Sequence, residues 1–308
     1  MNFPFSSPRN SGVKFLPAVA LICFSLSSQS AAPILVKDDR GETLTLRAPA
    51  QRIVAMAPYI TELVYAAGAG GKLVAVSEYS DYPQQAKNIM RIGDASHADL
   101  ERIAALQPDL ILAWKSGNHA GDIAKLENFG ANVFVMEPVK LSDVPRLLRG
   151  IGELAGTSAT AETAAKHFES SLEKLREQYR KARPITVFYE IWNEPLMTVN
   201  GAHMISSVLR LCGGINPFAT SRLLTPAISA ESLVAANPEV ILTGIARDDA
   251  WQRFKMLDAV RNHRIFYVQP DLLERQSPRI LEGASEVCRR LDEVRRAGIQ
   301  ESRPPAGK

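Results

Sequence analysis

The segment Ser158–Ala182 is a run of 25 residues without glycine or proline, whereas one of these two residues closes most other helix–strand units of the chain. Its apolar residues recur every three or four positions, which predicts one α-helix with a single apolar stripe. At 1.5 Å per residue this helix would be about 37 Å long, enough to join two domains, although an ordinary surface helix is the alternative. The stripe consists of Ala161, Ala164, Phe168, Leu172, Leu175 and Tyr179.

Short apolar runs alternate with amphipathic stretches on both sides of this segment. Such alternation predicts an α/β protein with mainly parallel sheets. Thr61–Ala67 and Leu100–Leu106 are among the expected helices. The expected strands are Arg52–Met56, Leu73–Val76, Leu110–Ala113, Val133–Met136, Thr186–Glu190, Val240–Thr243 and Ile265–Val268.

An internal repeat relates the two halves of the chain. Leu100–Leu112 and Ala230–Leu242 lie 130 positions apart and share a glutamate, a proline, an acid after that proline and an Ile-Leu pair in register. A helix–proline–strand unit is common, but five coincident positions favour a duplication. We therefore expect two similar α/β lobes with central, mainly parallel sheets joined by one long α-helix. The expected divisions are 33–157 for the first lobe, 158–182 for the linker helix, 183–296 for the second lobe and 297–308 for a disordered tail.

The first 32 residues have the pattern of a secretory signal peptide. Arg9 and Lys14 precede an apolar stretch, Phe15–Leu26, which is followed by the small-residue run Ser27–Ala32. Twelve apolar residues are fewer than the roughly 20 that span a bilayer. A signal peptide over residues 1–32 would direct export of the chain to the periplasm and then be removed, with lipidation at Cys23 as an alternative.

The composition excludes capture of a polyanion. The chain has 36 Lys and Arg against 33 Asp and Glu, and loss of the signal peptide would leave a net charge of +1, with no basic stripe for nucleic acid.

Two cysteines, Cys212 and Cys288, would remain after loss of the signal peptide. In an oxidising compartment they most simply pair with each other, and two buried free thiols are the alternative.

Five segments in order carry a resemblance to a known family. With the long helix between them, they resemble the helical-backbone class of periplasmic substrate-binding proteins that serve ABC importers of metal chelates, and most of all its cobalamin (vitamin B12) binding members. The segments are RIVAMAPYITELVYAAGAG at 52–70, SEYSDYP at 77–83, LERIAALQPDLILAW at 100–114, VLRLCGGINPF at 208–218 and DLLERQSPRI at 271–280.

The resemblance implies a corrinoid, cobalamin or cobinamide, bound in a cleft between the lobes. Aromatic rings suit the apolar face of a macrocycle, and Asp and Arg side chains suit its peripheral amides. Trp192 is a further candidate because it follows an expected strand, while core or rim packing is the alternative for each aromatic. The implied ligand-binding residues are Tyr79, Trp114, Asp271, Leu272, Leu273, Glu274 and Arg275.

Three positions depart from the cobalamin-binding pattern. Ala95, Thr225 and Leu272 stand where the cobalamin binder carries tryptophans, which would reshape the pocket. Haem or a ferric siderophore are therefore alternative ligands, and a tyrosinate at Tyr79 could ligate haem iron.

The resemblance also implies a partner. Glu101 and Glu231 occupy equivalent positions in the repeat, and in the family such a pair docks onto arginines of a symmetric permease dimer in the inner membrane. The alternative is that each glutamate simply favours a helix N-terminus.

The resemblance also bears on the two cysteines, because Cys212 and Cys288 match the disulfide positions of the family. We expect a monomer that binds no nucleic acid.

Other functional classes find little support in the sequence. The five histidines are scattered rather than clustered, so we expect no metal site. Asn193-Glu194-Pro195 after a strand resembles the acid/base segment of a glycosidase, with Glu194 as the acid/base, but a long helix between repeated halves does not suit a closed barrel. No Gly-x-Ser-x-Gly, Walker or His-Glu-x-x-His motif occurs. We therefore expect no catalysis and no catalytic cofactor.

Overall fold

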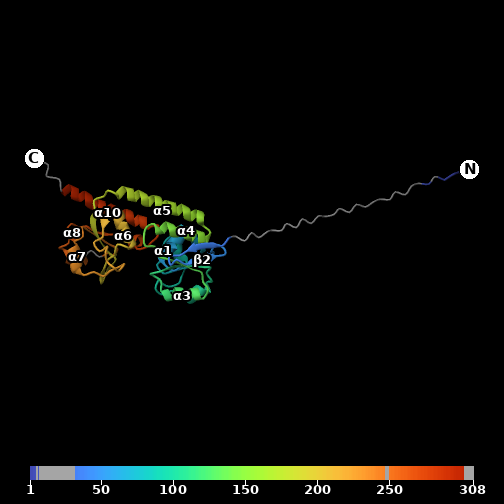
Figure 1. The fold of residues 1–308 in the computed structure, drawn as a ribbon, viewed down its shortest axis with the longest axis horizontal. Helices are drawn as coiled ribbons and strands as arrows, with labels where there is room; N and C mark the ends of the chain where they lie inside the picture. The colour runs from blue at the N-terminus through green and yellow to red at the C-terminus, as the bar shows by residue number, and fades with distance from the viewer. Residues whose placement is uncertain (5, 7–31, 247–249, 302–308) are drawn as a thin grey trace. The chain divides into compact units, whose positions relative to one another are not determined.

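Two parallel β-sheets, one before and one after a long helix, form the framework of the protein (Figure 1). The computed structural model describes residues 1–4, 6, 32–246 and 250–301. Residues 5 and 7–31 of the expected signal peptide and residues 302–308 of the expected tail therefore lie outside the described residues. We call the elements from β1 to α4 the first lobe and those from β8 to α10 the second lobe.

The first lobe contains a five-stranded sheet in the order β5-β4-β3-β6-β7, and every pair in it is parallel. A two-stranded antiparallel hairpin, β1-β2, precedes it. The strands are β1 Ile34–Lys37, β2 Thr43–Leu46, β3 Ile53–Ala55, β4 Leu73–Val76, β5 Met90–Arg91, β6 Leu110–Trp114 and β7 Val133–Met136. The helices are α1 Pro58–Ala66, α2 Leu100–Ala105, α3 Ala120–Asn128 and α4 Asp143–Ala155, with short 3₁₀ helices at Gly70–Lys72 and Gln84–Asn88.

The second lobe contains a four-stranded parallel sheet in the order β11-β8-β12-β13 and a small hairpin, β9-β10. Its strands are β8 Ile185–Glu190, β9 Trp192–Asn193, β10 Leu196–Met197, β11 Gly214–Ile215, β12 Val240–Thr243 and β13 Ile265–Tyr267. Its helices are α6 Met204–Leu211, α7 Ala230–Ala236, α8 Asp258–Arg261, α9 Pro270–Leu273 and α10 Ile280–Glu301, with a 3₁₀ helix at Ala250–Phe254.

The repeat in the sequence has a counterpart in the topology. In the first lobe α2 leads into β6, which lies between β3 and β7, and in the second lobe α7 leads into β12, which lies between β8 and β13. Asp99 and Ser229 cap the two helices in the same way, since each side chain accepts a hydrogen bond from the backbone amide three residues later. The expected fold class, two similar α/β lobes joined by a long helix, is confirmed.

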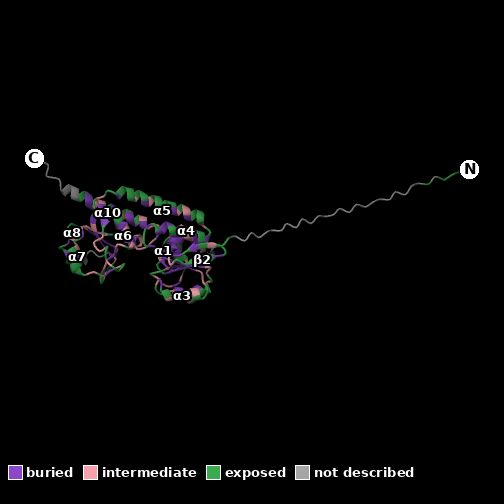
Figure 2. Cartoon of the chain, in the orientation of Figure 1, coloured by how far each residue is buried: buried purple, intermediate pink, exposed green. Residues whose placement is uncertain are grey.

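The long helix α5, Ser158–Tyr179, ends before the expected Ala182, in a turn that precedes Pro184. Its apolar stripe packs on α4 of the first lobe and on α6 and α10 of the second, while its outer surface is exposed (Figure 2). Gly152 of α4 permits close packing, because a Cβ there would lie 2.4 Å from the Cβ of Ala161.

One hydrophobic core continues through both lobes and includes Phe168 and Leu172 of α5. Accordingly, the described residues from Pro33 onward form a single compact unit. The helix α10 continues to Glu301, past the boundary expected at residue 296. Among the helices that the structure describes, none has the length and apolar character needed to cross a membrane.

Candidate functional site

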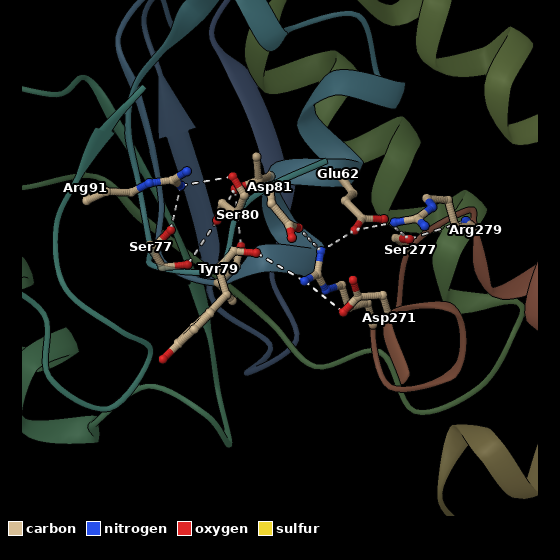
Figure 3. A network of polar contacts seen from close by, with 12 residues as sticks. Glu62, Ser77, Tyr79, Ser80, Asp81, Arg91, Asp271, Ser277 and Arg279 are labelled. Atoms are coloured by element: carbon tan, nitrogen blue, oxygen red, sulfur yellow. Dashed lines mark hydrogen bonds and ion pairs between the residues drawn. The ribbon is translucent and has the colours of Figure 1, made fainter. Parts of the chain in front are cut away.

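The loop after β4 holds Tyr79 in an exposed position. Tyr79 is 75% exposed, and its backbone has a φ of 62°, in the left-handed region that non-glycine residues rarely adopt. The loop beneath it is fixed by buried hydroxyls, since Ser80 Oγ lies 3.2 Å from Ser77 Oγ and accepts a hydrogen bond from Thr61. Arg91 donates to the backbone oxygens of Ser77 and Ser80. The ring is therefore presented by a rigid loop (Figure 3).

Arg275 of the second lobe reaches this loop. Its Nη1 donates to Glu62 Oε1 at 3.0 Å and to Asp81 Oδ1 at 2.7 Å. Its Nη2 donates to the backbone oxygen of Tyr79 at 3.2 Å and forms an ion pair with Asp271 Oδ1 at 2.9 Å. Burial raises the pKa of Asp81, but the hydrogen bond and charge of Arg275 outweigh that effect, so that the pKa is lowered. Arg275 thus connects Asp271 with the loop that carries Tyr79, through the backbone oxygen of Tyr79.

Glu62 of α1 is a buried carboxylate at the same junction. It accepts hydrogen bonds from Ser277 Oγ at 2.5 Å and from Arg279 Nη1 at 3.3 Å, in addition to the one from Arg275. Burial raises the pKa of Glu62, and its hydrogen bonds and the two arginine charges offset this increase only in part. The guanidinium of Arg279 also lies 4.0 Å from the centre of the Tyr82 ring, a cation–π contact.

The other residues of the 271–275 segment differ in what they contact. Leu273 was expected to contact the ligand. It is 1% exposed and packs in the core, so its side chain supports the segment from below and is not available to a ligand. Leu272 is half-buried. Glu274 accepts a hydrogen bond from the hydroxyl of Tyr189 at 2.9 Å, and burial raises the pKa of Glu274.

The two tryptophan candidates lie at the ends of strands. Trp114 ends β6 and is half-buried, with the ring of Tyr59 edge-on to it at 5.7 Å. Gly117 leaves room for this ring, because a Cβ there would lie 1.8 Å from Trp114 Cε3. Trp192 is exposed, and its indole donates to the backbone oxygen of Glu194 in the turn between β9 and β10. Among the described side chains, no hydrogen bond, ion pair or ring contact links either tryptophan to the Tyr79–Arg275 group.

The repeat glutamates are exposed in the first turns of α2 and α7. Hydrogen bonds from the backbone of Glu231 itself and from Ser229 lower the pKa of Glu231. Glu231 also lines a surface pocket of about 790 Å³ together with the apolar side chains of Val234 and Met256. Both glutamates are therefore available to a partner.

The disulfide between Cys212 and Cys288 is confirmed. Cys212 follows α6, and Cys288 lies in α10, 76 residues later. The bond therefore lies inside the second lobe. In the described part of the chain, no group of three His, Cys, Asp or Glu side chains gathers as a metal site.

Sequence reasoning did not single out Glu62, Asp81, Ser277 or Arg279. Glu62 is the one charged residue of the helix α1, PYITELVYA, most of which is buried. A lone acid at a buried helix position is the signal that could have identified it, because a buried charge requires a partner.

Comparisons with known proteins show the family of this chain. Residues 53–272 match the family model described as Periplasmic binding protein. The vitamin B12-binding protein of Vibrio cholerae serotype O1 is 37% identical over 244 residues, which cover 78% of this chain and 88% of the relative. That of Yersinia pestis is 35% identical over 254 residues, or 82% and 90% of the two chains.

Solved structures agree with the fold. The periplasmic vitamin B12-binding protein of Vibrio cholerae has a TM-score of 0.76 and 37% identity, with 80% of this chain and 98% of that chain covered. A periplasmic haem-binding protein from Roseiflexus has a TM-score of 0.73 at 21% identity over 79% and 98% of the two chains, which shows a shared fold alone. The chain belongs to the periplasmic binding protein family. Within that family, it is similar to proteins named for vitamin B12 binding.

Proposed function

We propose that this chain is a periplasmic solute-binding protein that captures a corrinoid, cobalamin or cobinamide, and delivers it to an ABC importer. The observation that carries the proposal is the 37% identity to a vitamin B12-binding protein over 88% of that relative's length. The Tyr79 loop, Asp271 and Arg275 support it, because Arg275 joins the backbone of this loop to Asp271, and an exposed ring, an acid and a base suit a macrocycle with peripheral amides.

The ligand would lie between the two lobes, against the loops that carry these residues. Trp114 and Trp192 would contribute apolar surface from the end of β6 and the start of β9. In this arrangement the protein binds and releases its ligand without chemical change, so no catalytic group is assigned and the ligand is cargo rather than cofactor.

The wider organisation follows the same proposal. Residues 1–32 would be removed as a signal peptide, and the mature monomer would comprise the first lobe, the helix α5 (Ser158–Tyr179) and the second lobe, whose last helix α10 reaches Glu301. Glu101 and Glu231, one exposed acid on each lobe, would dock onto arginines of a permease dimer.

The test is the visible spectrum of the purified mature protein after incubation with cyanocobalamin, cobinamide or haemin and desalting. We expect one corrinoid per protein, with a dissociation constant below about 1 μM, or roughly −8 kcal/mol, by calorimetry. Retention of haemin alone would contradict the corrinoid and assign a haem ligand. Loss of all three would leave a siderophore as the ligand to examine.

A further inference from the structure

The side chain of Glu62 is 2% exposed, and Glu62 is not among the residues proposed to contact the ligand. Removing a carboxylate from water costs several kcal/mol unless partners replace the water. The side chains that replace it, Ser277, Arg275 and Arg279, all belong to the second lobe, whereas Glu62 belongs to the first. The charge of Glu62 is therefore compensated only while the two lobes keep this arrangement.

Arg275 of the second lobe also binds to several groups of the first lobe. Its Nη1 and Nη2 atoms contact four oxygens, and those of Glu62, Asp81 and Tyr79 come from the first lobe. The fourth oxygen belongs to Asp271, in the same segment as Arg275. The guanidinium of Arg275 thus holds the Tyr79 loop of the first lobe at a set distance from Asp271 of the second lobe (Figure 3).

We propose that Glu62 is a positioning residue of the ligand site, which, with Ser277 and Arg279, holds Arg275 and Asp271 against the Tyr79 loop before any ligand arrives. The lobes are then already in the binding arrangement, and the ligand does not have to select it from a broader population. The link to affinity rests on the proposed function, whereas the effect on the lobes does not.

The test measures the arrangement of the lobes without ligand. Cysteines for spin labels replace Lys125 on α3 and Arg261 on α8, two exposed residues, while the native cysteines stay paired in the disulfide. Electron–electron double resonance then gives the distance distribution between the lobes. Glu62→Gln keeps the shape of the side chain and removes its charge, and we expect the distribution to broaden or shift. Glu62→Asp retains the charge and should restore much of the narrow distribution.

Glu282→Gln is the matched control, because Glu282 is an exposed glutamate near the start of α10 and undergoes the same chemical change. It should leave the distribution as in the wild type. Ser277→Ala removes one hydrogen bond to Glu62 without removing a charge, so it should broaden the distribution less than Glu62→Gln does. If Glu62→Gln fails to fold, Ser277→Ala alone tests the proposal. Distributions unchanged in both the Glu62→Gln and Ser277→Ala proteins would overturn the proposal.

Affinity provides the second measurement. Because the apparent dissociation constant rises as the competent fraction falls, Glu62→Gln should weaken binding of cyanocobalamin about tenfold. An unchanged affinity in this variant would overturn the positioning role. If the wild type itself binds no corrinoid, the proposed function fails, and the distance distributions still decide whether Glu62 holds the lobes.

Discussion

At Tyr79 the backbone and the side chain meet different requirements. The backbone adopts a left-handed conformation, and its oxygen accepts a hydrogen bond from Arg275, while the ring remains in water. A residue held in such a strained backbone conformation is typical of active sites and ligand-binding loops. The exposure of this ring supports the proposal that Tyr79 contacts the ligand.

We expect Tyr79→Ala to weaken corrinoid binding at least about tenfold while leaving the fold intact, since a well-packed aromatic contact at a binding hot spot contributes 2 kcal/mol or more. Calorimetry gives the affinity, and circular dichroism gives the fold. Phe129→Ala is the control, because Phe129 is 76% exposed and lies at the end of α3. Equal affinities for the wild type and the Tyr79 variant would mean that the ligand lies elsewhere.

His203 makes the stability of the second lobe dependent on pH. Burial lowers its pKa from 6.5 to about 4, and its Nδ1 accepts a hydrogen bond from the amide of Ile205 at the start of α6. Between these two pH values the unfolded chain binds more protons than the folded chain, so the free energy of unfolding falls as the pH falls from 6.5 towards 4.

For this one group the loss by pH 4.5 is about 2 kcal/mol, since one pKa unit corresponds to about 1.4 kcal/mol. His203→Asn keeps an N-capping side chain and removes the titration. Urea unfolding at pH 7 and pH 4.5 should therefore show a decrease in stability smaller by about that amount in the variant than in the wild type. Equal decreases in both proteins would show that His203 is protonated in the folded state.

At the level of the elements, periodicity and composition were sufficient for the framework. All seven expected strands are present, because buried parallel strands are uninterrupted apolar runs, and Leu73–Val76, Val133–Met136 and Val240–Thr243 match residue for residue. The small strands β5, β9, β10 and β11 have two residues each, too few for any period to be visible. The sequence pattern therefore predicts the sheets better than their edges.

The candidate site was only partly predictable. Tyr79, Asp271 and Arg275 came from the resemblance, and Arg275 connects Asp271 with the Tyr79 loop. Glu62 and Arg275 are 213 residues apart, and no local pattern encodes such a pair, because it depends on how two lobes pack. Leu273 was expected at the ligand because it lies in the right segment, but it ends the single turn of α9 with its side chain buried in the core.

The disulfide between α6 and α10 should make a large contribution to stability. Closing a loop with a separation of 76 residues contributes about 4 kcal/mol in the chain-entropy model. Replacing both cysteines by alanine should lower the free energy of unfolding by about this amount, measured by denaturant titration. Reduced wild-type protein serves as the control and should match the variant.

The pairing itself has a separate test. Both cysteines are buried, so thiol labelling is carried out on protein unfolded without reductant. Mass spectrometry should then find Cys212 and Cys288 in one linked peptide pair. Labelling of both residues under these conditions would exclude the bond.

For the whole molecule, the repeat predicts how two exposed acids act together. Glu101→Arg and Glu231→Arg should each leave corrinoid affinity unchanged and reduce transport and complex formation with the permease, because a like charge would face the arginines proposed for the partner. The double variant should be worse than either single one. Uptake of labelled cobalamin in cells and pull-down of the permease provide the measurements.

Glu177→Arg is the matched control, since it makes the same change at an exposed position on α5. It should not affect uptake. Loss of ligand affinity with intact permease association in either repeat variant would mean that the glutamates face the ligand instead.

The helix α5 also limits how the family can change in length. Its stripe packs on α4, where Ala161 faces Gly152, and also on α6 and α10. Inserting one residue between these contacts would rotate the rest of the helix by about 100° and move it by about 1.5 Å. Its apolar stripe would then no longer face both the first and the second lobe. Surface loops accept insertions at little cost. Length differences among relatives should therefore accumulate in the loops, while the number of residues in this helix stays fixed or changes by nearly whole turns.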